Sequence, residues 1–259
     1  MKNIANVETV DKNKHGKLRV KYSQDYVHAK EFNLVAVTIG EFGACASNFP
    51  LMFVPAENNQ YRPVALLGLR PGENVYYGET GWDCTYMPLM FQRHPFVIGF
   101  DDRVDDDKTL ATCLHTNSPM LNETDGIAMF TDSGEETDFL KSRHLMMRDI
   151  FESEKVTDEF MRKVQDLKLL SPVDVLVKPE NGEPRRISGM FTISERKMKA
   201  LTAEQIQDLH QKDFLLACYL ILGSVFQLHN LMKLRNRKAE EKVTDYRIEI
   251  DPPPPPAAA

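Results

Sequence analysis

The chain has 259 residues, of which 42% are hydrophobic and 27% are charged, the composition of an ordinary globular protein. Acidic side chains outnumber basic ones by 38 to 32, which gives a formal net charge of -6 and a pI near 5.7. Binding of nucleic acid needs a surplus of Lys and Arg on one face, so this balance argues against a nucleic-acid partner.

The first half of the chain predicts short strands joined by turns. Residues 1–16 are polar and are expected to be frayed. Two short helical segments are expected, at 41–48 and 85–93. Alternating or β-branched apolar residues indicate strands at 17–22, 34–39, 51–54, 63–69, 75–77, 94–100 and 110–115. The acidic run DDRVDDD at 101–107 lacks the residue pattern of an EF-hand loop, so a solvated turn is expected and no metal site is predicted.

The second half predicts longer elements. Apolar residues recur at helical spacing over 136–170, which indicates one bent helix or two successive ones. Strand-like runs at 173–178 and 185–193 flank Asn181 and Gly182, a strong hairpin signal. Thr202 and Gln205 fit a capping box that opens a helix. A final helix over 213–237 carries the most hydrophobic stripe, and residues 238–259 are predicted to form a mobile tail because of their proline run.

These elements predict an α+β fold, in which a strand-rich N-terminal half with an antiparallel or mixed sheet is packed by a helical C-terminal half. One integrated domain over 17–237 is expected because no Gly/Ser/Pro linker interrupts it, with a boundary near Asp132 as the alternative. The longest apolar run, 214–226, is too short to span a bilayer and indicates a core helix. No signal-peptide pattern opens the chain, so a cytoplasmic location is expected, with signal-free export left open.

Known catalytic patterns are absent from the sequence. The four cysteines are far apart and form no CxxC pair, which favours reduced thiols over a zinc site or a disulfide framework. There is no HExxH pair, phosphate-binding loop, dinucleotide fingerprint or nucleophile elbow. The sequence therefore predicts no metal and no cofactor.

Aromatic and arginine residues are concentrated between 61 and 96. Rings and guanidinium groups together recur where peptides, sugars or anions bind, although rings more often cover a sheet edge. An enzyme with an unfamiliar active site around Trp82, Asp83 and Cys84, or around Arg93 and His94, is the alternative to a binding site. The ligand-binding candidates are Arg70, Tyr77, Trp82, Tyr86, Arg93 and His94.

Several linked blocks carry a family resemblance. They are PVALLGLRPGEN at 63–74, YMPLMFQRHPF at 86–96, TDGIAMF at 124–130, GMF at 189–191, and the last helix around Leu222, Gly223 and Asn230. In these blocks the chain resembles the SapC family, named for a protein associated with bacterial surface-layer loci. The likeness runs from about Lys17 to Leu234.

The resemblance implies a non-catalytic accessory or binding protein that recognises a protein, peptide or envelope-related partner. Family members commonly occur near genes for TonB-dependent receptors, halogenase-like proteins and cupin-like oxygenases of Gram-negative bacteria, which implies a role in uptake or modification systems. The family carries no known reaction, cofactor or catalytic residue. The proline-rich end departs from the usual pattern of the family, and the absence of a signal-peptide pattern argues against a direct structural role in the surface layer.

Removal of residues 252–259 is expected to leave the melting temperature unchanged within error, because a proline run forms neither helix nor sheet. Thermal unfolding of the full and shortened chains measures this. A clearly lower melting temperature for the shortened chain would show instead that the prolines dock on the fold.

Overall fold

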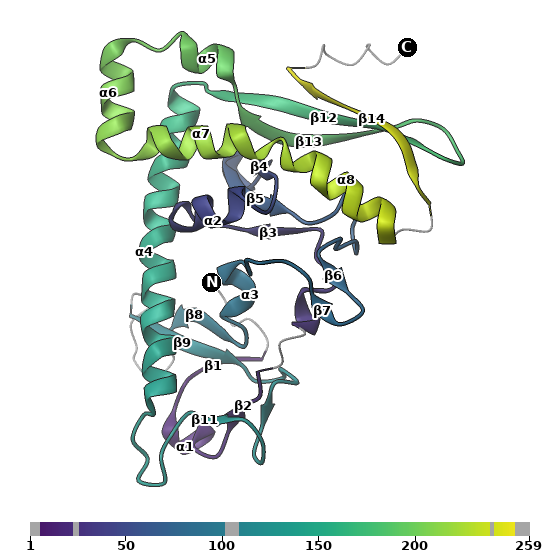
Figure 1. The fold of residues 1–259 in the computed structure, drawn as a ribbon. Coiled ribbons are helices and arrows are strands. Elements are labelled where there is room, and N and C mark those ends of the chain that lie inside the picture. The colour runs from purple at the N-terminus through teal and green to yellow at the C-terminus, as the bar shows by residue number, and fades with distance from the viewer. Residues whose placement is uncertain (1–5, 23–25, 102–108, 239–240, 252–259) are drawn as a thin grey trace. The chain divides into compact units, whose positions relative to one another are not determined.

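The computed structural model describes residues 6–22, 26–101, 109–238 and 241–251. The chain divides into two compact units, drawn in Figure 1. Unit 1 takes Met1–Tyr26 and Leu89–Glu154, and unit 2 takes Val27–Pro88 and Lys155–Ala259. The predicted single domain and its alternative boundary near Asp132 stay predictions.

Short antiparallel strands and part of one long helix build unit 1. One sheet has the order β1 (Val7–Thr9), β9 (Leu110–His115), β8 (Phe96–Phe100), and the other has the order β10 (Leu121–Asn122), β2 (Arg19–Val20), β11 (Ile127–Ala128). Two short helices, α1 (Lys12–His15) and α3 (Leu89–Gln92), accompany them. The buried core consists of Val10, Val20, Phe96, Leu114, Met129, Phe130, Leu140, Met147 and Ile150.

Helix α4 (Asp138–Asp166) is one continuous helix, as in the first of the two alternatives predicted from the apolar spacing. Its residues up to Glu154 belong to unit 1, and the rest belong to unit 2. In unit 1 it buries Leu140, Met147 and Ile150, which share one helical face.

Unit 2 is built on a six-stranded antiparallel sheet. The strand order is β14 (Val243–Ile250), β12 (Leu170–Pro179), β13 (Arg185–Ile193), β4 (Leu51–Pro55), β5 (Tyr61–Leu66), β3 (Leu34–Ala36). A small ribbon joins β6 (Tyr77–Gly78) to β7 (Gly81–Trp82). The helices are α2 (Phe42–Ala46), α5 (Glu195–Lys199), α6 (Ala203–Gln211), α7 (Phe214–Ser224) and α8 (Gln227–Lys238), with 3-10 turns at Val27–Ala29, Ile39–Glu41 and Glu57–Asn59.

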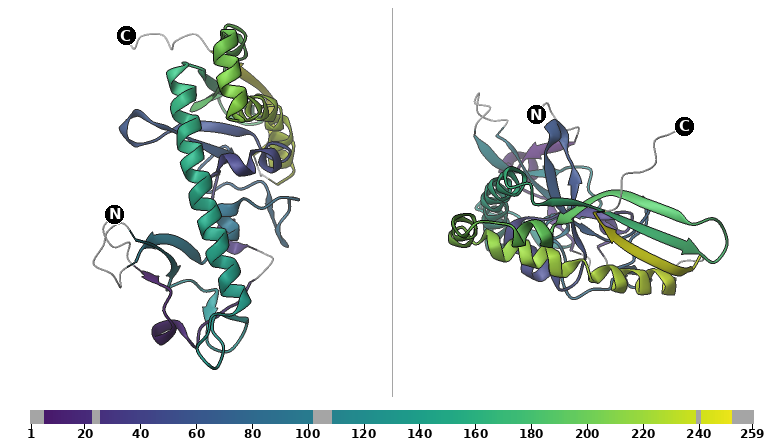
Figure 2. Two further views of the ribbon diagram at one scale, coloured as in Figure 1. Left: turned by 90° about the vertical axis from the view of Figure 1, so that its left-hand side faces the viewer. Right: turned by 90° about the horizontal axis from the view of Figure 1, so that it is seen from above.

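Helix α7 lies against one face of this sheet, over β13 and β4 (Figure 2). An aromatic cluster fills the core beneath it. The Phe160 ring from the end of α4 lies 5.9 Å from Phe42, 6.4 Å from Phe53 and 5.4 Å from Phe214, measured between ring centroids. All four side chains are almost fully buried, so this cluster fixes α2, α4 and α7 on the sheet.

The predicted α+β class is confirmed, with antiparallel sheets in the strand-rich half and a long apolar helical segment near the end. The capping box of Thr202 and Gln205 opens α6, and the strands on either side of Asn181 and Gly182 pair as β12 and β13. The capping box and the hairpin depend on neighbours in the sequence, which is why local patterns predict them.

The final helical segment contains a break that its apolar stripe did not predict. A turn at Val225 and Phe226 separates α7 from α8. The hydroxyl of Ser224 bonds the Ile221 carbonyl at 2.7 Å, and it also accepts the backbone N–H of Leu51 at 2.9 Å. Side-chain bonding back to the preceding turn bends helices, so anchoring Ser224 to β4 accounts for the interruption.

Both predicted frayed ends need correction. Residues 238–259 were expected to form a mobile tail, yet Val243–Ile250 is the strand β14 and pairs with β12 from Val173 to Pro179. Residues 1–16 were expected to be frayed, yet Val7–Thr9 is β1 and Lys12–His15 is α1. The polar or proline-rich composition hid these elements, because their stability comes from partners far along the chain. Residues 1–5 and 252–259, and residues 102–107 of the predicted acidic turn at 101–107, lie outside the described residues.

The sequence block at 63–74 forms most of the strand β5 and a tight loop after it, which two glycines and the carboxylate of Glu73 shape. A Cβ on Gly68 would lie 2.0 Å from the carbonyl oxygen of Glu73, and Gly72 has a positive φ of 80°, so both positions require glycine. The Glu73 carboxylate accepts the backbone N–H of Leu69 at 2.7 Å, and its other oxygen lies 2.9 Å from Nε of Arg235. Arg235 on α8 is only 3% exposed, so this is a buried ion pair.

The pair extends into a network around the segment that leads to β14. Arg235 donates from Nη1 to the carbonyl of Glu241 at 3.0 Å. The Glu241 carboxylate in turn lies 2.8 Å from Arg185 and 3.3 Å from Arg70. These contacts connect four parts of unit 2, namely the loop after β5, the helix α8, the strand β13 and the residues just before β14.

Replacement Glu73→Gln is expected to lower the free energy of unfolding by about 3 kcal/mol, because it leaves the Arg235 charge buried without its partner. Denaturant unfolding measures this change. Glu159→Gln is the matched control, since Glu159 forms an exposed pair with Lys212 and the loss of such a pair is expected to change stability far less. Equal effects of the two variants would contradict the structural role of the buried pair.

Candidate functional site

A groove of about 960 Å³ lies in unit 2 between the α7–α8 segment and the strand β14, and we call it the β14 groove. This volume lies at the upper end of the range typical of ligand sites, roughly 300–1,000 Å³. One wall comes from Tyr219 and Phe226 with their helical neighbours. The other comes from alternate residues of β14, with the start of α5 closing one end.

The lining of the groove is largely apolar and open to solvent. Tyr246, Ile248 and Ile250 alternate along β14, so their side chains share the face that borders the groove. Phe226 is 72% exposed, Tyr219 is 56% exposed and Ile250 is 45% exposed. Contiguous exposed apolar surface of this kind marks interaction sites in folded proteins.

Polar groups lie within and around this apolar surface. Nδ1 of His229 lies 2.6 Å from the Tyr246 hydroxyl, a hydrogen bond that links α8 to β14. Arg196 and Asp251 form an ion pair at 3.6 Å at the α5 end. Arg247, whose side chain is 77% exposed, also borders the groove. The site thus combines apolar walls with charges of both signs.

The α7–α8 segment also has the length and hydropathy of a membrane-spanning helix. The segment Phe214–Lys238 is long enough and apolar enough to cross a membrane, and 44% of its most apolar 18-residue stretch is buried within the protein. Phe214, Ala217, Cys218 and Ile221 of this segment are buried. Core helices have the same composition, so this observation is weak evidence for membrane insertion.

The predicted aromatic candidates in unit 2 are engaged in packing. The Trp82 indole donates to the carbonyl of Tyr86 at 3.0 Å, and its ring lies 6.0 Å from that of Phe49. The Tyr86 hydroxyl donates to the buried carboxylate of Glu41 at 2.9 Å. Tyr77 pairs with Trp82 across the β6–β7 ribbon. These contacts favour a packing role for the rings over a ligand-binding role.

The other predicted binding residues lie in different parts of the structure. Arg70 pairs with Glu241, while Arg93 and His94 belong to unit 1. Burial lowers the pKa of Arg93, and the charge of Glu154 offsets this in part. His94 Nε2 lies 2.9 Å from the Ser118 hydroxyl. None of the six candidates lines the β14 groove, and their ligand-binding role stays a prediction.

The sequence did not indicate the groove because its residues come from five separate elements, β13, α5, α7, α8 and β14. The available signal was the alternation of Tyr246, Ile248 and Ile250, which the adjoining proline run obscured. Tyr219 and Phe226 were counted as part of an apolar stripe, although they lie outside its buried face. No local pattern places these two groups of side chains opposite each other.

The thiols of unit 2 are poorly suited to nucleophilic chemistry. Burial raises the pKa of Cys218 to about 12. The pKa of Cys45 is raised mainly by burial and in addition by the negative charge of Glu41. Burial also raises the pKa of Cys84. Because the thiolate is the nucleophile, these shifts disfavour the alternative of an active site at Cys84. In the part of the chain that the structure describes, no three His, Cys, Asp or Glu side chains form a group able to hold a metal.

Comparison with known proteins identifies one relationship. A family model described as SapC matches residues 10–231, which reach from the end of β1 to α8. No curated protein and no solved structure matches the chain.

Iodoacetamide is expected to modify Cys45, Cys84 and Cys218 of the folded protein on the order of a hundredfold more slowly than after unfolding, because their raised pKa keeps the thiols protonated at neutral pH. Mass spectrometry of time points with and without denaturant measures the rates site by site. Rapid modification of Cys84 in the folded state would restore it as a candidate nucleophile.

Proposed function

The chain belongs to the SapC family, and from this premise we propose that it is a non-catalytic accessory protein that recognises an extended segment of a partner protein in the β14 groove. The observation that carries the proposal is an exposed apolar groove bordered by the outermost strand of the sheet. The raised pKa values of the buried thiols of Cys45 and Cys218 and of the half-buried thiol of Cys84 support a binding role over a catalytic one.

The edge of the sheet supports an extended occupant. β14 pairs with β12 along one side, and it is the last strand of the sheet in the described part of the chain. Backbone groups at a sheet edge are a template for another strand, and many peptide-binding domains use such an edge. A helix placed in the groove would leave these backbone groups without partners.

The lining of the groove specifies the chemistry of the segment. Side chains of an added strand project alternately to the two faces of the sheet. Those on the face of Tyr246 and Ile248 meet the rings of Tyr219 and Phe226, so this face selects aromatic or aliphatic residues. Arg196 and Arg247 are balanced by Glu195 and Asp251 nearby, which favours a segment with little net charge.

The resemblance to the family directs the choice of partner. We place the chain in the cytoplasm, with a partner from surface-layer, TonB-dependent uptake, or halogenase- or cupin-associated modification systems. In this role the protein contributes recognition, while any reaction belongs to the partner. Such a division fits a protein that exposes the rings of Tyr219 and Phe226 together in one groove.

A fluorescent decapeptide with alternating Phe/Val and Thr/Ser residues is expected to bind the full chain. Phe226→Asp is expected to weaken binding at least about tenfold, because it places a charge in the apolar wall. Leu145→Asp is the matched control, since Leu145 is also exposed but lies outside the groove. Fluorescence anisotropy measures the affinities.

Methylation of alternate backbone nitrogens in the peptide separates strand addition from simple hydrophobic contact. Methylation on the side facing β14 is expected to abolish binding, whereas methylation on the other side is expected to preserve it. Binding that ignores both methylation patterns and Phe226→Asp would overturn the proposal. Binding of the chain to neutral lipid vesicles through Phe226, with no peptide binding, would assign the groove to membranes instead.

A further inference from the structure

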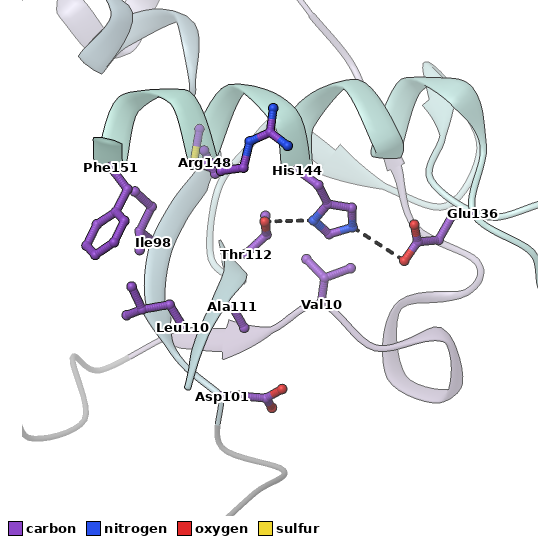
Figure 3. Close-up of a pocket in the computed structure, with 11 residues that line it drawn as sticks. Val10, Ile98, Asp101, Leu110, Ala111, Thr112, Glu136, His144, Arg148 and Phe151 are labelled. Atoms are coloured by element: carbon purple, nitrogen blue, oxygen red, sulfur yellow. Dashed lines mark hydrogen bonds and ion pairs between the residues drawn. The ribbon is translucent and has the colours of Figure 1, made fainter. Parts of the chain in front are cut away.

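A second cavity, of about 470 Å³, lies entirely in unit 1 (Figure 3). Side chains of α4 form one side, and β8 and β9 supply much of the rest. No residue of the β14 groove contributes to it. Its volume suits a small molecule, because ligand pockets commonly measure roughly 300–1,000 Å³.

His144 on α4 makes a hydrogen bond through one ring nitrogen, and its other ring nitrogen lies near a carboxylate. Nδ1 lies 2.7 Å from the Thr112 hydroxyl of β9, and Nε2 lies 3.4 Å from Oε1 of Glu136. Thr112 is only 9% exposed, so the ring is fixed from the buried side as well as from the loop that carries Glu136. The imidazole thus lies beside the Glu136 carboxylate, and both residues border the cavity.

A positive group lies one helical turn away. Arg148 follows His144 by four residues, so both side chains occupy the same face of α4. Its guanidinium lies across His144 from Glu136 in the view of Figure 3. It contacts Asp149 at 3.3 Å, but both side chains of this pair are more than half exposed, and such pairs are weak. A planar guanidinium in this position suits a carboxylate.

The remaining lining is apolar. The cavity is bordered by Ile98, Leu110, Met147 and Phe151. In Figure 3, Ile98, Leu110 and Phe151 lie together on the side away from Glu136. Asp101 adds a second carboxylate near the end of β8. The cavity therefore offers one guanidinium, two carboxylates and an apolar wall to a single small ligand.

From these groups we infer that unit 1 binds a small zwitterion with an apolar side chain, namely a free hydrophobic α-amino acid. The ligand carboxylate pairs with Arg148, and its ammonium group pairs with Glu136. Its side chain lies against Leu110 and Phe151. A simple fatty or aromatic acid would place no cation against Glu136, and a simple amine would place no anion against Arg148 beyond its weak pair with Asp149.

The test is isothermal titration calorimetry of the full chain with leucine, phenylalanine and tryptophan, and with two analogues of phenylalanine. Phenylpropionate lacks the ammonium group, and phenethylamine lacks the carboxylate. At least one amino acid is expected to bind, and each analogue of phenylalanine is expected to bind at least about tenfold more weakly than phenylalanine does. Absence of heat with all three amino acids at millimolar concentration would overturn the inference, as would equal affinity for phenylalanine and either analogue.

Variants of the exposed charges assign the two ends of the ligand. Arg148→Gln is expected to weaken phenylalanine binding at least about tenfold while leaving the weak binding of phenethylamine unchanged. Glu136→Gln is expected to weaken phenylalanine binding by a similar factor while leaving the weak binding of phenylpropionate unchanged. Lys141→Gln, at an exposed position of α4 outside the cavity, is the control and is expected to change nothing. Unchanged phenylalanine binding in Arg148→Gln would refute the assignment, and unchanged melting temperatures establish that the variants are folded.

Discussion

The buried ion pair between Glu73 and Arg235 is the constraint on which the architecture of unit 2 depends. Two glycines allow the loop after β5 to fold back, so that one carboxylate caps the loop backbone and pairs with α8. Arg235 also bonds the backbone of Glu241, just before β14 begins. The position of β14, and with it one wall of the groove, is therefore coupled to a turn in the first third of the chain.

Sequence patterns predicted what depends on near neighbours. The apolar spacing predicted α4, and Thr202 with Gln205 predicted the start of α6, because helices and caps are formed by residues a few positions apart. They could not predict β14, which exists through its pairing with β12, nor the contact of Glu73 with Arg235. The aromatic block around Trp82 was recognisable as a family signature, and its rings prove to be engaged with each other and with the backbone.

The two candidate sites were hidden from the sequence for the same reason. His144 was visible as a helical histidine, but motif spacing cannot bring Thr112 and Glu136 to its two nitrogens. The β14 groove likewise joins a helical stripe to a strand beyond it in the chain. The sites differ in chemistry, since one is an open apolar surface at a sheet edge and the other is a smaller cavity with paired charges. That contrast favours a macromolecule for the first and a metabolite for the second.

The division of the chain into two interleaved units bears on how the protein is made. Unit 2 begins before unit 1 is finished and resumes only at Lys155, so neither unit is contiguous in translation. The strand β4 joins the rest of its sheet through Phe53 and Phe191, which emerge from the ribosome far apart in time. Until β13 is synthesised, the apolar strands β4 and β5 present an unpaired edge. An unpaired strand edge is a template for non-native pairing, so the order of synthesis leaves β4 open to such pairing until β13 has been made.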